Sequence, residues 1–296
     1  MRLASLLHLL LLGLAAGCAP RLSGEAAPRR EVIRVGESRV ELISWPEDAR
    51  SARQVAQALE LALPRAARWG RLEVPVTLTI HPSHAALETA ARRSGYDWLR
   101  AWARYGSIDL QAPATWGIFG ASDAQVADLL THELTHCVMY QRAAAEWTWS
   151  LKGIPLWFRE GMASVTAGQG ARRGTLEDLW RYYEQGLAAD GAGDGEAGRG
   201  AARVRAARGQ RSDGDPLADP EPLYQDRSDV VYGAAHHAFV FLVDRYGEGR
   251  VRETMERMRG GATFPRAFQE SFGVTEVEFS ADFRRFVLWQ GWQREE

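Results

Sequence analysis

Two histidines four residues apart, with a glutamate directly after the first, stand in the stretch THELTHCVMYQ, Thr131 to Gln141. In a helix, residues i and i+4 share one face, so His132 and His136 can direct two imidazoles at one cation. Glu133 then lies beside that site, where it can orient and deprotonate a water at the metal. This spacing indicates the site of a zinc hydrolase.

A catalytic zinc needs a third protein ligand and an open position for water. Glu160 follows His136 by twenty-four residues and lies in the stretch LWFREGMASV. An acidic side chain at an otherwise apolar helix start costs free energy to bury unless it is paired or binds a metal. We therefore expect Glu160 to complete a zinc site with the two histidines. The opposite interpretation is coincidence, since helical histidines also serve as surface or core residues; equimolar bound zinc would exclude it.

The composition is that of a globular protein with a real core, since 46% of the 296 residues are hydrophobic and 25% are charged. A net charge of −2 gives no indication of nucleic-acid binding. Only two cysteines are present, Cys18 and Cys137, so no disulfide framework is expected if Cys18 carries lipid. Cys137 falls on the apolar stripe of its helix and is expected to be a packed thiol.

The first residues resemble an export signal. Arg2 precedes a nearly continuous apolar run, Leu3 to Ala16, which is too short to span a bilayer but has the length of a signal-peptide core. The run leads into LAAGC, which resembles a bacterial lipobox. We therefore expect residues 1–17 to be a signal peptide and Cys18 to be lipidated, the alternative being a plain secretory signal cleaved near Ala16.

Residues 18–30 would then form the lipid anchor and a flexible tether to the domain. The protein would lie in the bacterial cell envelope, held to the membrane through its N-terminal lipid. Because Ala19, and not an aspartate, follows the cysteine, the outer membrane is the expected location.

The N-terminal part, residues 31–144, is predicted to be mixed α/β because strand and helix periods alternate along it. The helix of the histidines begins at a capping box formed by Ser122 and Gln125. The elements expected before it are a hairpin around Gly36, a helix from Ser51 to Trp69, and strands from Val74 to Ser83 and Gly106 to Pro113.

The C-terminal part, residues 145–296, is predicted to be helical, which makes the fold class α+β. A stretch rich in Gly, Ala, Asp and Arg, at about residues 188–222, has no apolar period and is expected to be a flexible insertion. One helix is expected to begin near Pro155, and another is expected to end at Gly247. Four more are expected over Thr175–Gly186, Gly249–Arg259, Thr263–Phe272 and Thr275–Trp289.

HELTH followed by WFREGMA resembles the gluzincin zinc peptidases, specifically the bacterial peptidase MA-like group, in which HExxH on one helix is completed by a glutamate on the next. VTLTIHPS, GSIDLQAP and YGAAHHAFVFLVDRYG resemble the upstream strand, the edge strand and the downstream helix of that group, so the resemblance covers roughly Val74 to Trp289. It implies a zincin-like fold in which zinc is held by His132, His136 and Glu160. The general base in such a site would be Glu133.

The resemblance also implies roles for other parts of the chain. The edge strand Gly106–Pro113 would align an extended peptide by β-augmentation. Tyr232 would stabilise the tetrahedral oxyanion, although a structural role stays open for it and His236 or His237 could serve instead. Thermolysin-like members have an aspartate four residues after the ligand glutamate, which supports the first histidine. This chain has Ser164 there, so the hydrogen bonding behind the first histidine must come from another group or be weaker.

Together these patterns favour a zinc-dependent metallopeptidase, acting as an endopeptidase, that hydrolyses a peptide or protein substrate with metal-activated water. The alternative function is that of a zinc-stabilised envelope lipoprotein that binds peptides or envelope components without cleaving them. Protease activity against an unfolded protein would separate the two functions.

The lipid anchor is tested by the location of the mature protein. We predict that the wild type partitions into the membrane fraction and that Cys18→Ser releases it, because the substituted chain has no thiol to acylate. Fractionation followed by immunoblotting measures this. A wild-type protein found entirely in the soluble fraction would contradict the lipobox interpretation.

Overall fold

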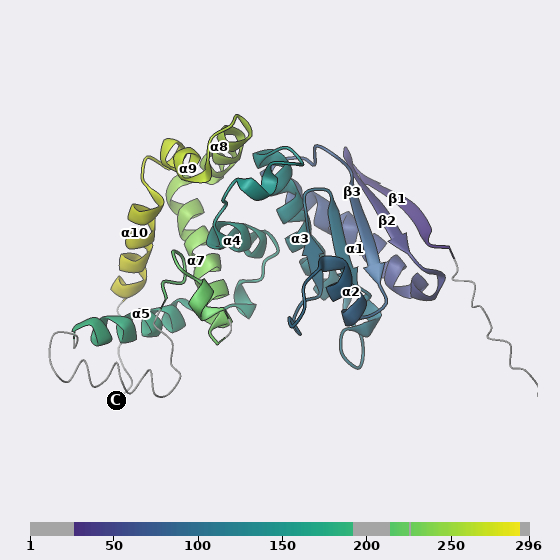
Figure 1. Ribbon diagram of the computed structural model, residues 1–296, viewed down its shortest axis with the longest axis horizontal. Coiled ribbons are helices and arrows are strands. Elements are labelled where there is room, and N and C mark those ends of the chain that lie inside the picture. Colours follow the sequence, from purple (N-terminus) through teal and green to yellow (C-terminus); the bar gives the residue numbers. More distant parts are fainter. Residues whose placement is uncertain (1–26, 192–213, 225, 291–296) are drawn as a thin grey trace, which may run out of the picture.

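A five-stranded sheet forms the first half of the computed structural model, which describes residues 27–191, 214–224 and 226–290 (Figure 1). The strand order is β1-β2-β3-β5-β4, with parallel pairing of β3 to β2 and to β5 and antiparallel pairing at both edges. The strands are β1 (Arg29–Val35), β2 (Ser38–Ser44), β3 (Val76–His81), β4 (Ala101–Ala103) and β5 (Ser107–Gln111).

The hairpin expected around Gly36 is confirmed as β1 and β2, and the positive φ of 57° at Gly36 is the backbone conformation that this turn needs. The strand begins at Arg29, so the last two residues of the expected tether belong to the sheet. In β3, Val76, Leu78 and Ile80 are fully buried and alternate with half-buried residues, as one packed face of a sheet requires.

Helices α1 (Ala49–Ala66) and α3 (Asp123–Ala143) pack against each other and against the buried face of the sheet. Helix α2 (His84–Ala91) packs on β3 and β5, where Leu87 forms a small separate apolar cluster with Leu99. The capping box predicted for the start of α3 is present, with Ser122 and Gln125 bonding reciprocally. From Val126 onward most of α3 is buried, because the sheet half covers one side and the helical half the other.

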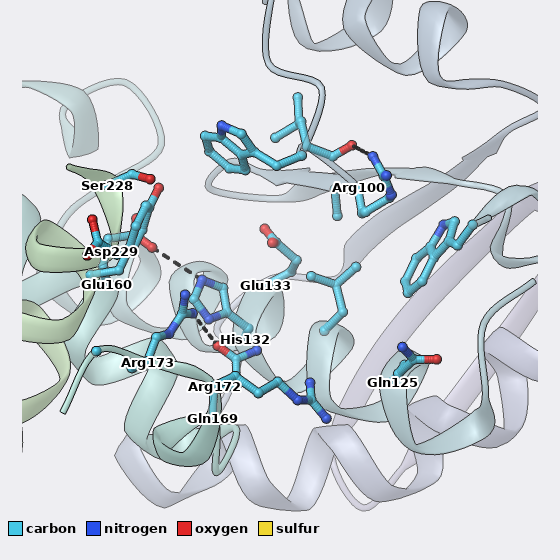
Figure 2. A pocket seen from close by; sticks show the side chains of 17 residues that line it. Arg100, Gln125, His132, Glu133, Glu160, Gln169, Arg172, Arg173, Ser228 and Asp229 are labelled. Atoms are coloured by element: carbon cyan, nitrogen blue, oxygen red, sulfur yellow. Dashed lines mark hydrogen bonds and ion pairs between the residues drawn. The ribbon is translucent and has the colours of Figure 1, made fainter. Parts of the chain in front are cut away.

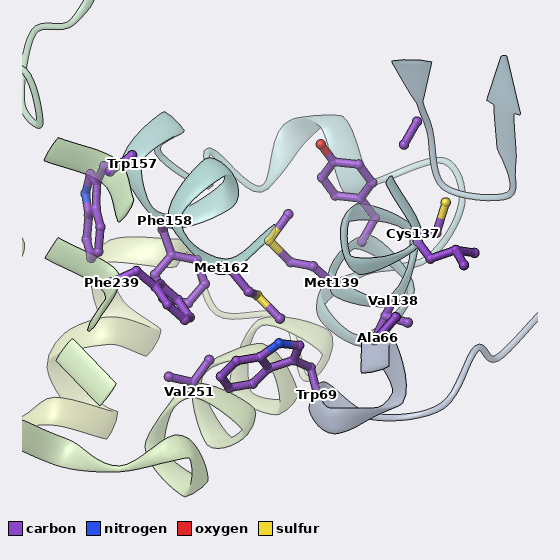
Figure 3. Close-up of a cluster of buried hydrophobic side chains, with 14 of the residues drawn as sticks. Ala66, Trp69, Cys137, Val138, Met139, Trp157, Phe158, Met162, Phe239 and Val251 are labelled. Atoms are coloured by element: carbon purple, nitrogen blue, oxygen red, sulfur yellow. The ribbon is translucent and has the colours of Figure 1, made fainter. Parts of the chain in front are cut away.

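The second half of the chain is helical, as expected (Figure 1). Its core is aromatic, and Trp69 joins it to the first half by an edge contact with Phe239 and a hydrogen bond of 2.6 Å to the Thr166 hydroxyl. Figure 3 shows Trp69 and Phe239 in one cluster with Phe158 and Met162. The helices are α4 (Leu156–Thr166), α5 (Leu176–Gly191), α7 (Ser228–Tyr246), α8 (Glu248–Arg259), α9 (Phe264–Phe272) and α10 (Glu276–Trp289).

One strand assignment is wrong. Gly106–Pro113 was predicted as the edge strand, but its strand β5 lies between β3 and β4. The edge is instead β4, which has only three residues and therefore carries no period that a sequence pattern can reveal. The chain turns back at once after β4, through a backbone hydrogen bond from the Arg104 N–H to the Ser107 carbonyl.

The expected insertion at about residues 188–222 is narrower than predicted at both ends. Helix α5 continues to Gly191, and residues 214–224 pack against the fold. Leu217 and Leu223 are buried in the main core, and the Tyr182 hydroxyl donates to the Gly214 carbonyl. The remainder of the insertion, residues 192–213, lies outside the described residues, as do the expected signal peptide and Cys18. Among the described residues no helix is both long and apolar enough to cross a membrane.

Helices α4 and α7 approach each other closely because Gly161 has no side chain. A Cβ at Gly161 would lie 2.3 Å from the Ala235 carbonyl oxygen and 2.6 Å from the Cβ of Phe239. We predict that Gly161→Ala destabilises the fold by about 1–3 kcal/mol, because backbone cannot yield as a flexible side chain does. Thermal unfolding should show a Tm lower by roughly 2–10 °C.

Gly249→Ala is the matched control, since Gly249 also lies in a helix and a Cβ there would meet nothing within 4 Å. Its Tm should equal or slightly exceed that of the wild type, because alanine favours the helix by up to about 1 kcal/mol. Equal melting temperatures for the two variants would show that the α4–α7 contact is not tight.

Candidate metal centre and active-site cleft

Helices α3 and α4 bring the three predicted ligands together. The Nε2 atoms of His132 and His136 lie 3.2 Å apart. The Glu160 carboxylate reaches them from α4, with Oε2 at 3.3 Å from Nε2 of His132 and Oε1 at 3.7 Å from Nε2 of His136. One donor atom from each residue therefore faces a common point, and both imidazoles are buried.

These separations fit a tetrahedral zinc ion. Zn–N and Zn–O bonds of about 2.0–2.2 Å at tetrahedral angles place the ligand atoms about 3.4 Å from one another. The two imidazole nitrogens, 3.2 Å apart, are close to that value, and one donor atom from each of the three residues lies within 4.8 Å of the others. Two imidazoles and one carboxylate are also a donor set of catalytic zinc sites, which keep a fourth position for water. Both the chemistry and the spacing of the donors therefore suit zinc.

The protonation states suit a metal as well. Burial lowers the pKa of His136 to about 3, so its imidazole is neutral at pH 7 and its lone pair is free to bind. Burial would raise the pKa of Glu160, but the facing imidazoles of His136 and His132 and the guanidinium of Arg159 outweigh that effect and lower it. The acid is therefore ionised, as a ligand must be.

The support behind the histidines differs from that of thermolysin-like enzymes, as Ser164 led us to expect. The Ser164 hydroxyl lies 3.0 Å from Nδ1 of His236 and accepts a hydrogen bond of 3.2 Å from Nε of Arg173. Within the described residues, the buried Nδ1 atoms of His132 and His136 have no hydrogen-bond partner. The His136 ring instead lies parallel to that of Tyr140, with centroids 6.0 Å apart, so packing orients it.

Glu133 lies beside the three ligands, on the side of the edge strand β4. Its carboxylate is buried and accepts a hydrogen bond from the backbone N–H of Ala103. Burial raises the pKa of Glu133 to about 7. A carboxyl group with a pKa near the working pH is suited to accept and return a proton.

Tyr232, on α7, lines the cleft together with Glu160. Its hydroxyl is hydrogen-bonded to that of Tyr224, and burial raises its pKa, so it remains a donor at neutral pH. The two alternatives to it are engaged elsewhere: His236 contacts Ser164, and Nε2 of His237 lies 3.0 Å from the Gly174 carbonyl. Neither histidine lines the cleft.

The cleft has two halves that share the centre formed by His132, Glu133 and Glu160. One half, of about 490 Å³, contains Arg173 (Figure 2). The other, of about 1400 Å³, contains Arg159, and Trp98 borders both.

The sequence interpretation did not identify either arginine. Arg159 directly precedes Glu160 and is a charged residue at a buried helix start, which was an available signal. Arg173 follows Arg172 and has the pattern of a solvated surface pair, so only the tertiary structure reveals it. Cys137 is buried with its Sγ against the Arg104 carbonyl and takes no part in the site, as expected.

No protein-family model matches this chain, and no curated protein matches it. Among solved structures it is similar to an M1 zinc metallopeptidase from Deinococcus radiodurans, with 16% identity, a TM-score of 0.41, and coverage of 90% of this chain and 53% of that one. A mutant of an M1 zinc metallopeptidase from the same organism gives 15% identity, a TM-score of 0.42, and coverage of 90% and 54%.

A two-domain M1 zinc metallopeptidase mutant bound to L-tryptophan gives 16% identity, a TM-score of 0.39, and coverage of 88% and 52%. The chain thus spans about half the length of the solved structures it matches. A likeness at this identity and score is too distant to assign an activity, which must come from the geometry of the site itself.

Proposed function

We propose that this chain is a zinc-dependent peptidase of the gluzincin type that cleaves peptide bonds within an extended chain. The observation that carries this proposal is the set of three donor atoms within 4.8 Å of one another, with a buried carboxyl group, Glu133, directly beside it. A purely structural metal site is closed by four protein ligands. Here the described residues supply three, and the remaining side faces a cleft.

His132, His136 and Glu160 would hold the zinc, which when bound supplies a Lewis acid for the substrate carbonyl and acidifies water. Glu133 accepts the proton of the attacking water and later delivers it to the leaving amine. Tyr232 donates a hydrogen bond to the carbonyl oxygen as negative charge develops on it. The low polarity of the buried site strengthens these interactions.

The edge strand β4 would position the substrate. Arg100 and Arg104 pair with β5, so along this alternating ladder Ala101 and Ala103 direct their N–H and C=O groups away from the sheet. The Ala103 N–H is donated to Glu133, which leaves the Ala103 carbonyl and both groups of Ala101 for a peptide. An extended peptide can add to this edge and continue the sheet. Because Glu133 bonds to the Ala103 N–H, a peptide on β4 lies directly over the general base.

A non-catalytic, zinc-stabilised protein that binds peptides is the second candidate. It is favoured by the two buried histidine Nδ1 atoms without partners among the described residues. Ligand imidazoles usually donate that N–H to a carboxylate or carbonyl, which raises their basicity and fixes their orientation. The intact Glu133 favours catalysis. Lipid anchoring through Cys18 in the cell envelope is part of the proposal, and the membrane fractionation described above tests it.

Changing each of the two glutamates to glutamine should remove a different property of the protein. In Glu133→Gln the three ligands stay, so about one zinc per chain should remain, while cleavage of an unfolded protein should fall by ~10²- to 10⁴-fold. Glu160→Gln removes the anionic ligand, so zinc content and Tm should both fall. Elemental analysis, thermal unfolding with and without chelator, and a protease assay measure these effects.

Glu73→Gln is a matched control, because Glu73 pairs with Arg142 outside the cleft. It should keep both zinc and activity. Zinc binding without any cleavage by the wild type would favour the second candidate. Full zinc and full activity in Glu160→Gln would exclude the proposed ligand set.

A further inference from the structure

The smaller half of the cleft has an excess of positive charge. Three arginines line it, Arg100, Arg172 and Arg173. Apart from Glu133 and Glu160 at the catalytic centre, the single acidic residue that lines this half is Asp229, whose side chain is largely exposed and pairs with Arg227. Because Asp128 already offsets the charge of Arg172, the positive charge of this wall that is open to an anionic group lies on Arg100 and Arg173.

Arg173 differs from its neighbour in what it contacts. The Arg172 guanidinium is exposed and forms an ion pair of 2.9 Å with Asp128. The Arg173 guanidinium donates to the Gln169 side-chain oxygen at 2.6 Å and to the Ser164 hydroxyl at 3.2 Å, both of which are neutral groups. Within the described chain, Arg173 makes no ion pair with a carboxylate.

The Arg173 guanidinium is half-buried and lies 5.2 Å from the centre of the Tyr232 ring. Burial lowers its pKa, which is the signature of a charge held away from water without full compensation. The Glu160 charge acts on it from a distance, but that carboxylate already faces the two ligand imidazoles. Figure 2 shows Arg173 beside His132 and Glu160, next to the reacting centre.

The direction of a bound peptide decides which substrate residue reaches Arg173. The half of the cleft with Arg173 reaches β4 at its start, at Arg100, whereas the other half alone reaches the end of β4, at Trp102 and Ala103. A strand that adds antiparallel, as β4 itself adds to β5, has its C-terminal end at the start of β4. Residues after the scissile bond then lie against Arg173.

We propose that Arg173 binds a carboxylate of the substrate on the C-terminal side of the scissile bond. The enzyme therefore prefers peptides with an acidic side chain directly after the cleaved bond. Where the cut lies one residue from the end of the chain, the free terminal carboxylate takes the same place. A guanidinium binds either carboxylate through two parallel hydrogen bonds. This inference rests on the proposed peptidase function, which it deepens by naming the substrate class.

Cleavage sites in an unfolded protein, mapped by mass spectrometry, provide the first test. A peptide that contains one cleaved bond is then made in matched forms, with Glu or Gln after that bond and with a free or amidated C-terminus. We expect the acidic or free-acid form to have a kcat/KM higher on the order of 10- to 100-fold, the range of a hydrogen bond to a charged group. The Glu/Gln pair and the acid/amide pair distinguish the two sources of the carboxylate.

The ratio of kcat/KM between the acidic and the neutral peptide should fall to near one in Arg173→Gln. Arg173→Lys should keep part of that ratio, because the positive charge stays while the planar guanidinium, which binds a carboxylate through two hydrogen bonds, is lost. Arg172→Gln is the matched control and should keep the full ratio, since Asp128 already neutralises Arg172. A ratio measured within one variant does not depend on how much of it folds. Affinities of the same peptides for the zinc-loaded Glu133→Gln protein, from fluorescence anisotropy, should follow the same order.

Equal kcat/KM values for the matched peptides in the wild type would overturn the inference while leaving the peptidase intact. So would a preference that survives in Arg173→Gln, or an acidic preference on the N-terminal side of the cut. Failure of the proposed function looks different, since no peptide is then cleaved. The anisotropy measurement would still decide whether Arg173 selects a carboxylate.

Discussion

The half-buried carboxylate of Glu160, held against two imidazoles, is the constraint on which the rest of the structure depends. An ionised acid away from water is costly unless charge and hydrogen bonds compensate it. His136 is neutral at pH 7, and two facing imidazole nitrogens cannot both donate. A cation at their common point satisfies both lone pairs and the carboxylate together. The site is thus coherent as a metal centre.

The fold places this centre where its two halves meet. Helix α3 belongs to the sheet half and α4 to the helical half, and the three proposed zinc ligands are divided between them. Trp69 fixes the relation of the halves by bonding across to Thr166, and Gly161 positions α4 within the helical half by allowing α7 to approach it. The cleft lies at the same boundary between the sheet half and the helical half, so a substrate on β4 would touch residues of both halves.

Local patterns were enough to predict that His132, His136 and Glu160 lie together. The i, i+4 spacing of His132 and His136 puts both on one helical face whatever the rest of the chain does, and Glu160 stands out as a charge in an apolar helix start. The hairpin at Gly36 and the capping box at Ser122 are local too. The lipidation of Cys18 stays a prediction, because that residue lies outside the described chain.

What could not be predicted depends on contacts distant in sequence. The edge position of β4 follows from its partner and not from its three residues, which is why Gly106–Pro113 was assigned to the edge wrongly. The packing of Leu217 depends on a core formed elsewhere. Arg173 has the same sequence environment as Arg172, and only the position of Asp128 separates a neutralised arginine from an uncompensated one.

The central claim, that three side chains from two helices hold one zinc ion, is tested most directly by anomalous diffraction at the zinc edge from crystals of the zinc-loaded domain. The account predicts one strong peak bonded to Nε2 of His132, Nε2 of His136 and the Glu160 carboxylate, at about 2.0–2.2 Å. The three side chains should keep the arrangement described above. No peak at this point, or a fully occupied peak bonded to other residues, would contradict it.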